Sequence, residues 1–373
     1  MSVSIRIGCF DSRFRFRFKH ASADRISTEN VIVEVRDEHG IQGYGEGCPR
    51  VYVTGESTPS AIDFLARHSV HIVRGASTLR AFDDLIMSNG RKIDSHPAAF
   101  CALEIALIDL FARRGGRPVE ALLGLPPLSG TVNYSGIIGD GSPRKTALYS
   151  LVYRSLGLGD FKVKLGRDPA IDRRRFAALP ARARIRVDAN NLFHDSGECV
   201  RHIRALKRPI WAVEEPLAAG DFDNMREVAS ELGCRIILDE SLTRIDQLEI
   251  IAPDPATWVL NLRVSKCGGI IRTNALARAA EALGVGVIIG AHVGETSLLT
   301  RAALCAGQAL AEPALAREGA FGDVLLASDL TEPSIRFGRR GALSLERKTY
   351  GRSPGLGLKV RSDSIRWLNA FDA

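Results

Sequence analysis

The sequence lacks any apolar run long enough to cross a membrane, and it lacks an apolar signal region at its start. A membrane-spanning helix needs about 18 consecutive apolar residues, and a secretory leader needs an apolar segment after a short basic one. Instead, Arg6, Arg13 and Arg15 interrupt the first part of the chain. We therefore expect a cytoplasmic protein that has no membrane partner.

Cysteine is also scarce, and its spacing excludes two common uses. The seven cysteines are an odd number, and no two of them form a CxxC pair. Disulfide frameworks and cysteine-based zinc sites are built from regularly spaced pairs. We expect free, structural thiols in a reducing compartment.

Basic residues exceed acidic ones, but they are not gathered into a block. The formal net charge is +7, with 50 Lys and Arg and 43 Asp and Glu mixed along the chain. The densest basic stretch, residues 12–20, alternates arginine with phenylalanine, and a period of two is typical of a half-buried strand. We therefore expect no nucleic-acid partner, whereas the positive charge favours small anionic substrates.

The apolar content is sufficient for a large core in two domains. The chain has 373 residues, of which 45% are hydrophobic and 25% charged. Residues 31–47 alternate and turn at His39-Gly40, which predicts a hairpin. Residues 97–113 repeat apolar side chains at three- and four-residue steps before a Gly-Gly pair, which predicts a helix.

From about residue 130 the pattern changes to short apolar strands, each followed by a helical segment. The strand ends fall in steps of 24, 26, 25, 24 and 27 residues, at Lys164, Asp188, Glu214, Asp239, Arg263 and Gly290. Steps of that size indicate consecutive βα units and a parallel sheet. Two more strands are expected at 131–138 and 321–327, and a helix over 271–284.

These units predict an α/β protein with a modified (β/α)-barrel and an α+β capping domain. We expect the capping domain to span residues 1–127 and the barrel residues 128–338. Residues 339–373 lose the βα rhythm, so we expect this C-terminal segment to return to the capping domain. Chemistry in such barrels lies at the carboxyl ends of the strands.

Three successive strands end in carboxylates. Asp188, Glu214 and Asp239 each follow an apolar run, and at one barrel mouth they would repel each other unless a cation lay between them. Oxygen ligands with room for water and a substrate carboxylate suit Mg²⁺ better than zinc or copper. A single aspartate at a strand end is more often a helix N-cap, but three carboxylates at the same regular spacing favour a metal site.

Two lysines share one face of the strand before these carboxylates. Lys162 and Lys164 would lie about 6.6 Å apart along it, and their apolar neighbours argue against an exposed strand face. Each lysine would lower the pKa of the other, so one could act as a base near neutral pH.

The sixth and seventh strands end in further polar residues. Arg263 follows Asp239 at the regular spacing of the strand ends and is predicted to point into the mouth. Lys266 lies past the strand and is equally a loop or anion-binding residue. His292 and Glu295 follow the seventh strand. A lone histidine there is more often structural than catalytic.

Together these residues resemble the mandelate racemase and muconate lactonizing enzyme group of the enolase superfamily, and most closely its muconate-lactonizing branch. The motifs that look like its strand ends are KVK (162–164), VDAN (187–190), VEEP (213–216), LDES (238–241) and SKCGG (265–269). Residues 43–56 and 101–124 look like its capping domain, whose loops choose the substrate.

The resemblance implies roles for the matched residues. Asp188, Glu214 and Asp239 match the Mg²⁺ ligands, and Lys164 matches a base that has Lys162 as its partner. The implied chemistry is abstraction of a proton α to a carboxylate, giving an enediolate intermediate.

Arg263 departs from the family pattern, which has a lysine at this position. Arginine stays protonated at ordinary pH, so it can stabilise an enolate but cannot readily accept a proton. The departure argues against two-base racemisation through this pair, unless Lys266 or His292 supplies a second base.

We predict a Mg²⁺-dependent isomerase (racemase, epimerase or cycloisomerase) of a small carboxylate such as an amino-acid derivative, and a homo-oligomer. Asn190, Glu240, His292 and Glu295 are expected to contact the substrate, and side chains near 18–24 and 50–54 to select it. The alternatives are a one-base syn-dehydratase or lyase of a hydroxy acid, and a non-catalytic metabolite-binding relative in which Arg263 marks a lost activity.

Overall fold

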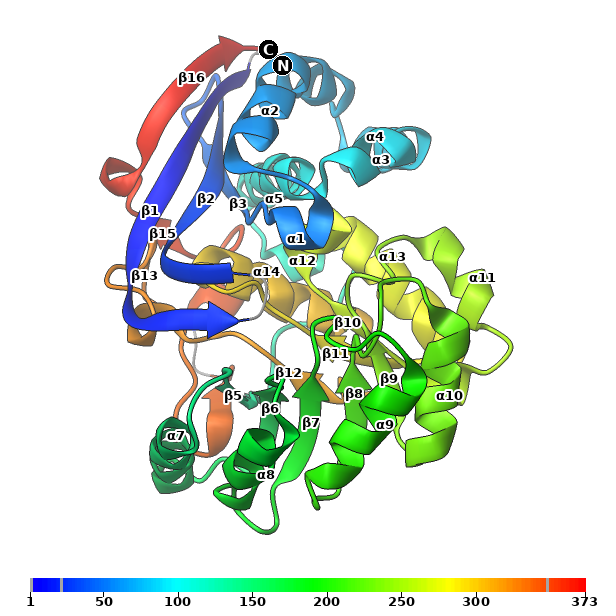
Figure 1. Ribbon diagram of the computed structural model, residues 1–373. Helices are drawn as coiled ribbons and strands as arrows, with labels where there is room; N and C mark the ends of the chain where they lie inside the picture. Colours follow the sequence, from blue (N-terminus) through cyan, green and yellow to red (C-terminus); the bar gives the residue numbers. More distant parts are fainter. Residues whose placement is uncertain (1–2, 21–22, 347–348) are drawn as a thin grey trace.

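An antiparallel sheet with its helices lies over one end of a parallel barrel (Figure 1). The computed structural model describes residues 3–20, 23–346 and 349–373, apart from the side chains of 16–20, 23–25 and 349. The antiparallel sheet has the order β16-β1-β2-β3, formed by β16 (Arg366–Asp372), β1 (Val3–His20), β2 (Ala23–Asp37) and β3 (Gln42–Gly47). The hairpin predicted over 31–47 is confirmed, with Gly40 at φ 80° in its turn.

Alternate residues of β1 and β2 form the inner face of this sheet, which packs against helices. The helices of this part are α1 (Val51–Thr54), α2 (Thr58–Gly75), α3 (Leu79–Ser88), α4 (Gly90–Ser95), α5 (Pro97–Arg114) and α6 (Val119–Leu122). Helix α5 approaches β3 so closely that a Cβ atom on Gly43 or Gly45 would lie 2.1 or 2.0 Å from one of its carbonyl oxygens. The predicted helix is confirmed, but it is buried on nearly all sides because the barrel covers its other face.

The barrel is one sheet of parallel strands in sequential order. Its strands are β5 (Gly136–Ile138), β6 (Asp160–Lys164), β7 (Arg184–Asp188), β8 (Ala212–Glu214), β9 (Arg235–Leu238), β10 (Trp258–Leu262), β11 (Gly286–Ile289) and β12 (Ala316–Arg317). Its longer helices are α7 (Pro143–Ser155), α8 (Pro169–Ala177), α9 (Ser196–Ala205), α10 (Phe222–Leu232), α13 (Ile270–Ala282) and α14 (Ser297–Ala306), with short α11 (Leu248–Ile251) and α12 (Val264–Cys267). A backbone hydrogen bond of 2.9 Å from Ser135 to Arg317 joins the two edge strands. The predicted barrel is confirmed.

Two of the predicted strands are placed differently. The eighth barrel strand is β12 (Ala316–Arg317), whereas residues 321–327 contain a 3₁₀ turn, Gly322–Val324. Gly319 and Gly322 adopt φ of 95° and 45°, and these left-handed turns carry the apolar run away from the sheet to pair Leu326 with Phe14. The predicted strand 131–138 is divided, because β4 (Thr131–Asn133) pairs with β14 (Ala342–Ser344) and only β5 enters the barrel.

The end of the chain returns to the first sheet. Strand β16 pairs with β1 in antiparallel register, so the two termini lie together in Figure 1. Between β14 and β16, β15 (Lys359–Val360) pairs with β13 (Thr331–Glu332). The domain limits at 127 and 338 stay a prediction.

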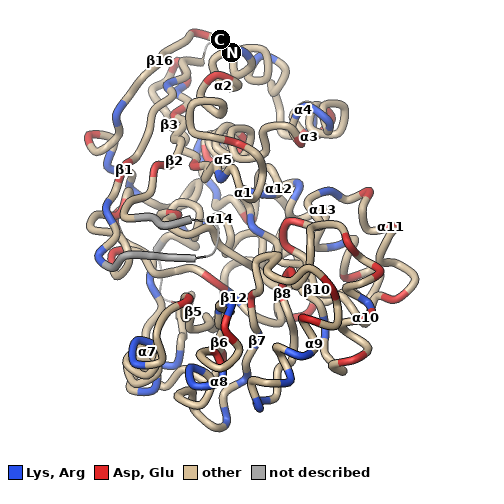
Figure 2. The backbone as a smooth tube through the Cα atoms, in the orientation of Figure 1, with Lys and Arg blue, Asp and Glu red and all other residues tan. Residues whose placement is uncertain are grey.

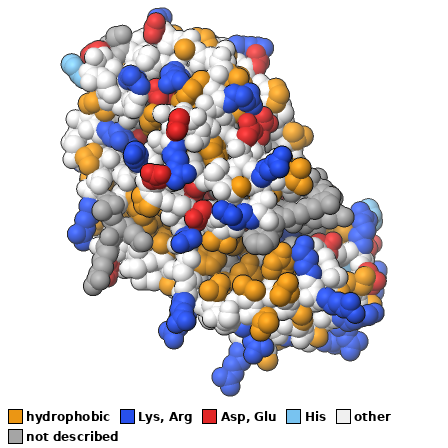
Figure 3. All heavy atoms as spheres, turned by 90° about the vertical axis from the view of Figure 1, so that its left-hand side faces the viewer, with side chains coloured by type: hydrophobic (Ala, Val, Ile, Leu, Met, Phe, Trp, Pro, Cys, Tyr) orange, Lys and Arg blue, Asp and Glu red, His pale blue; other side chains and the backbone are white. Residues whose placement is uncertain are grey.

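Lysine and arginine are mixed with acidic residues over both parts of the molecule (Figure 2). Apolar side chains gather low on the face shown in Figure 3, which includes α7 with its exposed Leu148, Leu151 and Val152. Six of the seven cysteines are buried, as expected of structural thiols. Among the described helices, none has the length and apolarity of a membrane span. The cytoplasmic location and the homo-oligomer stay predictions.

Candidate active site

Charged side chains fill the barrel between two adjacent strands. Three pairs lie in register across β6 and β7, namely Asp160 with Arg184, Lys162 with Arg186, and Lys164 with Asp188. The alternate residues Phe161, Val163, Ile185 and Val187 belong to the hydrophobic core. Because side chains alternate along a strand, DFKVK beside RIRVD directs all of these charges to the inner face.

Lys162 lies within a carboxylate cluster and is 3% exposed. Its Nζ is 2.8 Å from Glu214 Oε1, 3.1 Å from Asp188 Oδ2 and 3.2 Å from Glu318 Oε1. Burial alone would lower the pKa of Lys162, but these carboxylates raise it above its ordinary value. The expected lowering by its lysine neighbour is therefore wrong for Lys162, because the carboxylates dominate its surroundings.

Lys164 lies one layer nearer the mouth. Its Nζ donates to Asp188 Oδ2 at 2.8 Å and to Asn190 Oδ1 at 2.6 Å. Asn190 has a φ of 48°, and its N–H donates to Asp188 Oδ1 at 3.1 Å. A left-handed conformation costs a non-glycine residue about 1 kcal/mol or more. Asn190, expected to contact the substrate, is thus held where it orients the ammonium of Lys164.

The carboxylates predicted as metal ligands are brought together at adjacent strand ends. Asp188 and Glu214 are in register on β7 and β8, and Asp239 directly follows β9. Each is 1% exposed. Burial raises the pKa of Glu214 to about 7; Lys162 opposes this, while Asp188, Glu318 and Asp239 add to it. Negative charge at Glu214 is therefore incompletely offset by the neighbouring cations.

This donor set fits Mg²⁺ in its chemistry, since all of the donors are carboxylate oxygens. In this structure, lysine and arginine side chains form ion pairs with these oxygens. Among the described residues, no three His, Cys, Asp or Glu side chains are arranged around a common metal position. A cation on Asp188 would compete with Lys164 for the same oxygen.

Arg263 and Lys266 lie on the opposite side of the barrel. Arg263 Nη2 is 2.5 Å from Asp239 Oδ2 and 3.7 Å from Glu214 Oε1, so it points into the mouth. Lys266 Nζ is fully buried and donates to the carbonyl oxygens of Asp239 and Asn261, each at 2.7 Å, and to Asp239 Oδ1 at 3.0 Å. Its ammonium supports the loop that carries Asp239, which leaves it poorly placed to serve as a second base.

Two buried glutamates were missed from the sequence. Glu318 follows β12 and contacts Lys162; one more step of 28 residues from Gly290 would have found it. Glu215, at φ 40°, accepts hydrogen bonds from the backbone N–H groups of Asp239 and Ser241 at 2.6 and 2.8 Å. The sequence pattern does not single out Glu215, because it directly follows Glu214 and successive side chains point to opposite sides.

The β2–β3 hairpin holds the loop that follows β11. Asn30 Nδ2 donates to the carbonyl of Gly294 at 2.8 Å, and Arg50 Nη2 donates to that of Val293 at 3.0 Å. Arg50 is 1% exposed and its guanidinium is bound to this loop; the role of the segment 50–54 in selecting the substrate stays a prediction. The other predicted segment, 18–24, lies outside the residues whose side chains are described.

A carboxylate of the same hairpin caps a barrel helix. Glu46 accepts from the N–H groups of Thr296 and Leu299 at 2.9 and 3.2 Å, at the start of α14. Burial raises the pKa of Glu46 to about 7, against the hydrogen bonds from Thr296 and Leu299. The first sheet therefore sets the position of the helix that follows the seventh strand.

The remaining predicted contacts lie around the mouth. His292 is 3% exposed, and its backbone N–H donates to Glu295 Oε2 at 3.1 Å. Burial, together with Glu46, raises the pKa of Glu295 well above its usual range, although the hydrogen bond from the His292 N–H and the charge of Arg263 lower it. Burial, Asp239 and Glu215 raise the pKa of Glu240 to about 9, and Glu240 Oε2 has no hydrogen-bond partner in the described part of the chain.

Known proteins share this sequence pattern along most of the chain. Residues 5–124 match the family "Mandelate racemase / muconate lactonizing enzyme, N-terminal domain", and residues 147–364 match "Enolase C-terminal domain-like". An L-Lys-D/L-Arg epimerase from Methylococcus capsulatus is 30% identical over 95% of this chain and 98% of its own. Muconate cycloisomerase 1 from Rhodococcus opacus is 27% identical over 98% of this chain and 97% of its own.

A solved structure has the same fold. The dipeptide epimerase from Methylococcus capsulatus, complexed with Mg and the dipeptide L-Arg-D-Lys, superimposes with a TM-score of 0.80 at 28% identity. The superposition covers 96% of this chain and 99% of that one. The chain therefore belongs to the mandelate racemase and muconate lactonizing enzyme group of the enolase superfamily, a group of enzymes that includes epimerases and cycloisomerases.

Proposed function

We propose that this protein is a Mg²⁺-dependent isomerase in which Lys164 removes the proton α to the carboxylate of a small amino-acid derivative. The observation that carries the proposal is the position of Lys164, whose Nζ is held between Asp188 and Asn190 at 2.8 and 2.6 Å. A lysine fixed by two acceptors at the barrel mouth is aimed in one direction, as a base must be.

Asp188, Glu214 and Asp239 would hold the metal. When bound, Mg²⁺ would act as a Lewis acid beside the substrate carboxylate and make the α proton more acidic. Lys162 and Arg263 place two permanent positive charges near the same position, one from each side of the mouth. They stabilise the negative charge that develops on the substrate as the proton leaves.

Arg263 favours chemistry that needs a single base. Its guanidinium stabilises charge on the face opposite Lys164 without accepting a proton, which suits a cycloisomerisation or exchange at one enantiomer. Racemisation or epimerisation would need another base, and His292 is the candidate. A one-base syn elimination and a non-catalytic relative are the alternatives.

The substrate class is proposed from the names of the relatives and from the acidic side chains at the barrel mouth. The epimerases above act on, or bind, lysine and arginine dipeptides by their names. Glu240 and Glu295 follow strand ends at this mouth. Burial raises the pKa of both carboxyl groups, and a cationic substrate group beside either one favours its ionised form. We therefore propose dipeptides and N-acyl derivatives of basic amino acids as the first substrates to test.

The experiment is α-proton exchange in deuterated water. Each candidate is incubated with the enzyme with and without Mg²⁺, and deuterium at the α carbon is followed by NMR. Metal-dependent exchange that Lys164→Ala abolishes is the expected result. Exchange that persists unchanged in the presence of a strong chelator would exclude the metal role, and no exchange across the panel would favour the non-catalytic alternative.

A further inference from the structure

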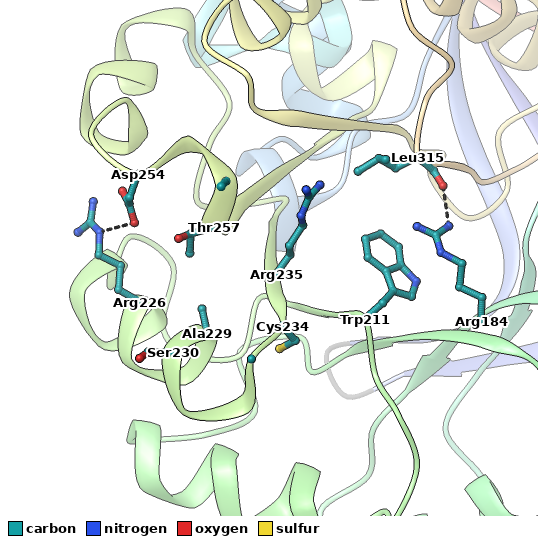
Figure 4. Close-up of a pocket in the computed structure, with 12 residues that line it drawn as sticks. Arg184, Trp211, Arg226, Ala229, Ser230, Cys234, Arg235, Asp254, Thr257 and Leu315 are labelled. Atoms are coloured by element: carbon teal, nitrogen blue, oxygen red, sulfur yellow. Dashed lines mark hydrogen bonds and ion pairs between the residues drawn. The ribbon is translucent and has the colours of Figure 1, made fainter.

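A hollow of about 830 Å³ opens at the amino-terminal end of the barrel, opposite the mouth that carries Lys164. Part of its lining comes from the starts of strands: Arg184 begins β7, Arg235 begins β9, and Trp211 and Leu315 directly precede β8 and β12. The rest comes from α10 and from the loops before β9 and β10. Figure 4 shows the guanidinium groups of Arg184 and Arg235 on either side of Trp211. The volume is in the range of small-molecule sites.

The arginines of the hollow differ in whether their guanidinium groups have hydrogen-bond or ion-pair partners. Arg226 is engaged by Asp254, Asp223 and the carbonyl of Ile250, at 3.1, 2.8 and 2.8 Å. The Arg235 side chain, in contrast, has no hydrogen-bond or ion-pair partner among the described residues.

Arg184 is also partly available. Its guanidinium carbon lies 4.0 Å from the centre of the Trp211 ring. Among the described residues, its side-chain hydrogen bonds go to Asp160 and to the carbonyl of Leu315, and both leave from Nη1. The hollow thus presents two guanidinium groups beside an indole and a leucine.

We propose that this hollow binds a small oxyanion with a flat apolar body, such as an aromatic carboxylate. Guanidinium groups recognise carboxylates through paired, charge-assisted hydrogen bonds. The indole of Trp211 and the side chain of Leu315 supply the apolar surface for the body.

A column of ion pairs leads from this hollow, where Asp160 is still 25% exposed, to the buried reaction centre. Arg184 Nη1 is 3.0 Å from Asp160 Oδ2, and Asp160 Oδ1 is 2.7 Å from Arg186 Nη1. Arg186 Nη2 is 3.0 Å from Glu318 Oε1, which is 3.2 Å from Lys162 Nζ. The side chain of Arg184 is 44% exposed, whereas those of Arg186, Glu318 and Lys162 are 6% exposed or less.

The column of ion pairs connects the hollow to the reaction centre. An anion that draws Arg184 away from Asp160 leaves Asp160 with Arg186 and the hydroxyl of Ser135 as partners. Arg186 then bears more of the Asp160 charge, which changes how strongly Arg186 and Lys162 share Glu318. Binding in the hollow therefore alters the rate of proton transfer at Lys164. This coupling rests on the proposed function, but the binding itself does not.

Binding is tested on the whole protein with benzoate as the probe. Titration calorimetry compares benzoate with neutral benzamide and with inorganic phosphate, which lack the charge and the ring respectively. We expect benzoate to bind best and Arg235→Gln to weaken it at least about tenfold, the loss typical of one charge-assisted contact. The matched control is Arg278→Gln, an exposed arginine of α13 outside the hollow.

Arg235 also separates this site from binding at the mouth. Benzoate binding that Arg235→Gln leaves unchanged, or equal binding of benzamide, would overturn the proposal. A several-fold loss confined to Arg235→Gln, with Arg278→Gln like the wild type, would support it.

Coupling is tested by α-proton exchange with and without saturating benzoate. We expect a several-fold change in rate in the wild type and none in Asp160→Asn, which keeps benzoate binding but breaks the column. Arg235→Gln should also lose the effect, which provides a second test if Asp160→Asn does not fold. Binding without any rate change would refute the coupling alone, and failure of all exchange would count against the proposed function while the binding result stands.

Discussion

At the scale of single residues, Arg263 decides which proton transfers the proposed reaction can use. Burial would lower the pKa of Arg263, but Asp239, Glu214, Glu318 and Glu240 raise it further above its usual value. The guanidinium therefore keeps its charge at any ordinary pH. In the proposed reaction, proton removal then depends on Lys164, whose ammonium is bound to Asp188 on the other side of the mouth.

The first prediction concerns this lysine and its neighbours. Lys164→Ala should reduce α-proton exchange about 10³-fold, the contribution typical of a general base. Lys162→Ala should leave measurable exchange, because it removes charge stabilisation and not the base. Asn190→Ala should fall between them, since it frees the ammonium that Asn190 Oδ1 holds at 2.6 Å. Deuterium incorporation measures all three, and equal, mild effects would mean that the pair is structural.

The second prediction concerns the face opposite Lys164. Wild-type enzyme should exchange the α proton of one enantiomer only, and Arg263→Lys should introduce or increase exchange of the other, because a lysine can release and accept a proton. Separate incubation of the two enantiomers in deuterated water measures this. Similar rates for both in the wild type would refute it and would direct attention to His292.

The third prediction concerns the metal and has a readout other than activity. Mg²⁺ should raise the unfolding temperature of the wild type, because a ligand that binds only the folded state stabilises it. Asp239→Asn should lose most of this shift, since one of three carboxylates is neutralised. Asp246→Asn is the matched control, an exposed aspartate whose carboxylate pairs with Arg244. An equal Mg²⁺ shift in both variants would remove Asp239 from the ligand set.

At the scale of elements, the regular spacing of the βα units is predictable from the sequence, whereas very short strands are not. The steps between Lys164 and Gly290 located six strand ends, although β9, β10 and β11 end one residue earlier than expected. Strand β12 has two residues, Ala316 and Arg317, which is too few to show a period. The apolar run at 324–326 was therefore mistaken for it, and Glu318 was lost from the predicted site.

An outer-layer cluster was also invisible to sequence reasoning. Asp172 on α8 receives hydrogen bonds from Arg175 at 2.5 Å, from the N–H of Gly166 at 2.9 Å and from His202 of α9 at 3.0 Å. Burial would raise the pKa of Asp172, but His202, Arg175 and Gly166 together lower it. The cluster joins two helices to the loop after β6, close to Lys164 in the chain.

The fourth prediction follows from that cluster. Asp172→Asn should destabilise the protein by about 3 kcal/mol at neutral pH, because it removes the nearer charge partner of the buried Arg175 and leaves only Asp140, at 3.5 Å. A carboxyl with a lowered folded pKa stabilises fully above its ordinary value of 3.8, and this contribution is lost as the pH falls through the folded pKa. Denaturant unfolding at several pH values should therefore show the two proteins converging in acid. A constant difference at all pH values would contradict the electrostatic origin, and Asp63→Asn serves as the exposed control.

At the scale of the whole molecule, the first sheet and the segment after it bind the barrel loop beside the candidate active site. Asn30 and Arg50 bind a loop more than 240 residues later in the chain, and Glu46 caps α14. The sequence predicted both parts and the carboxylates at the mouth from local patterns. It could not predict these contacts, because no periodicity relates residues so far apart.

The last prediction tests whether the first sheet holds the barrel loop that carries His292 and Glu295. Arg50→Gln should increase amide hydrogen exchange in residues 293–299 about tenfold, the change expected when a hydrogen bond of about 1.4 kcal/mol is lost. Because that loop faces the mouth, KM should rise more than kcat falls, and Arg50→Lys should recover part of the loss. Arg74→Gln, an exposed arginine on α2, is the control. Unchanged protection in 293–299 would mean that the loop keeps its shape without the sheet, and substrate selection would then belong to the barrel alone.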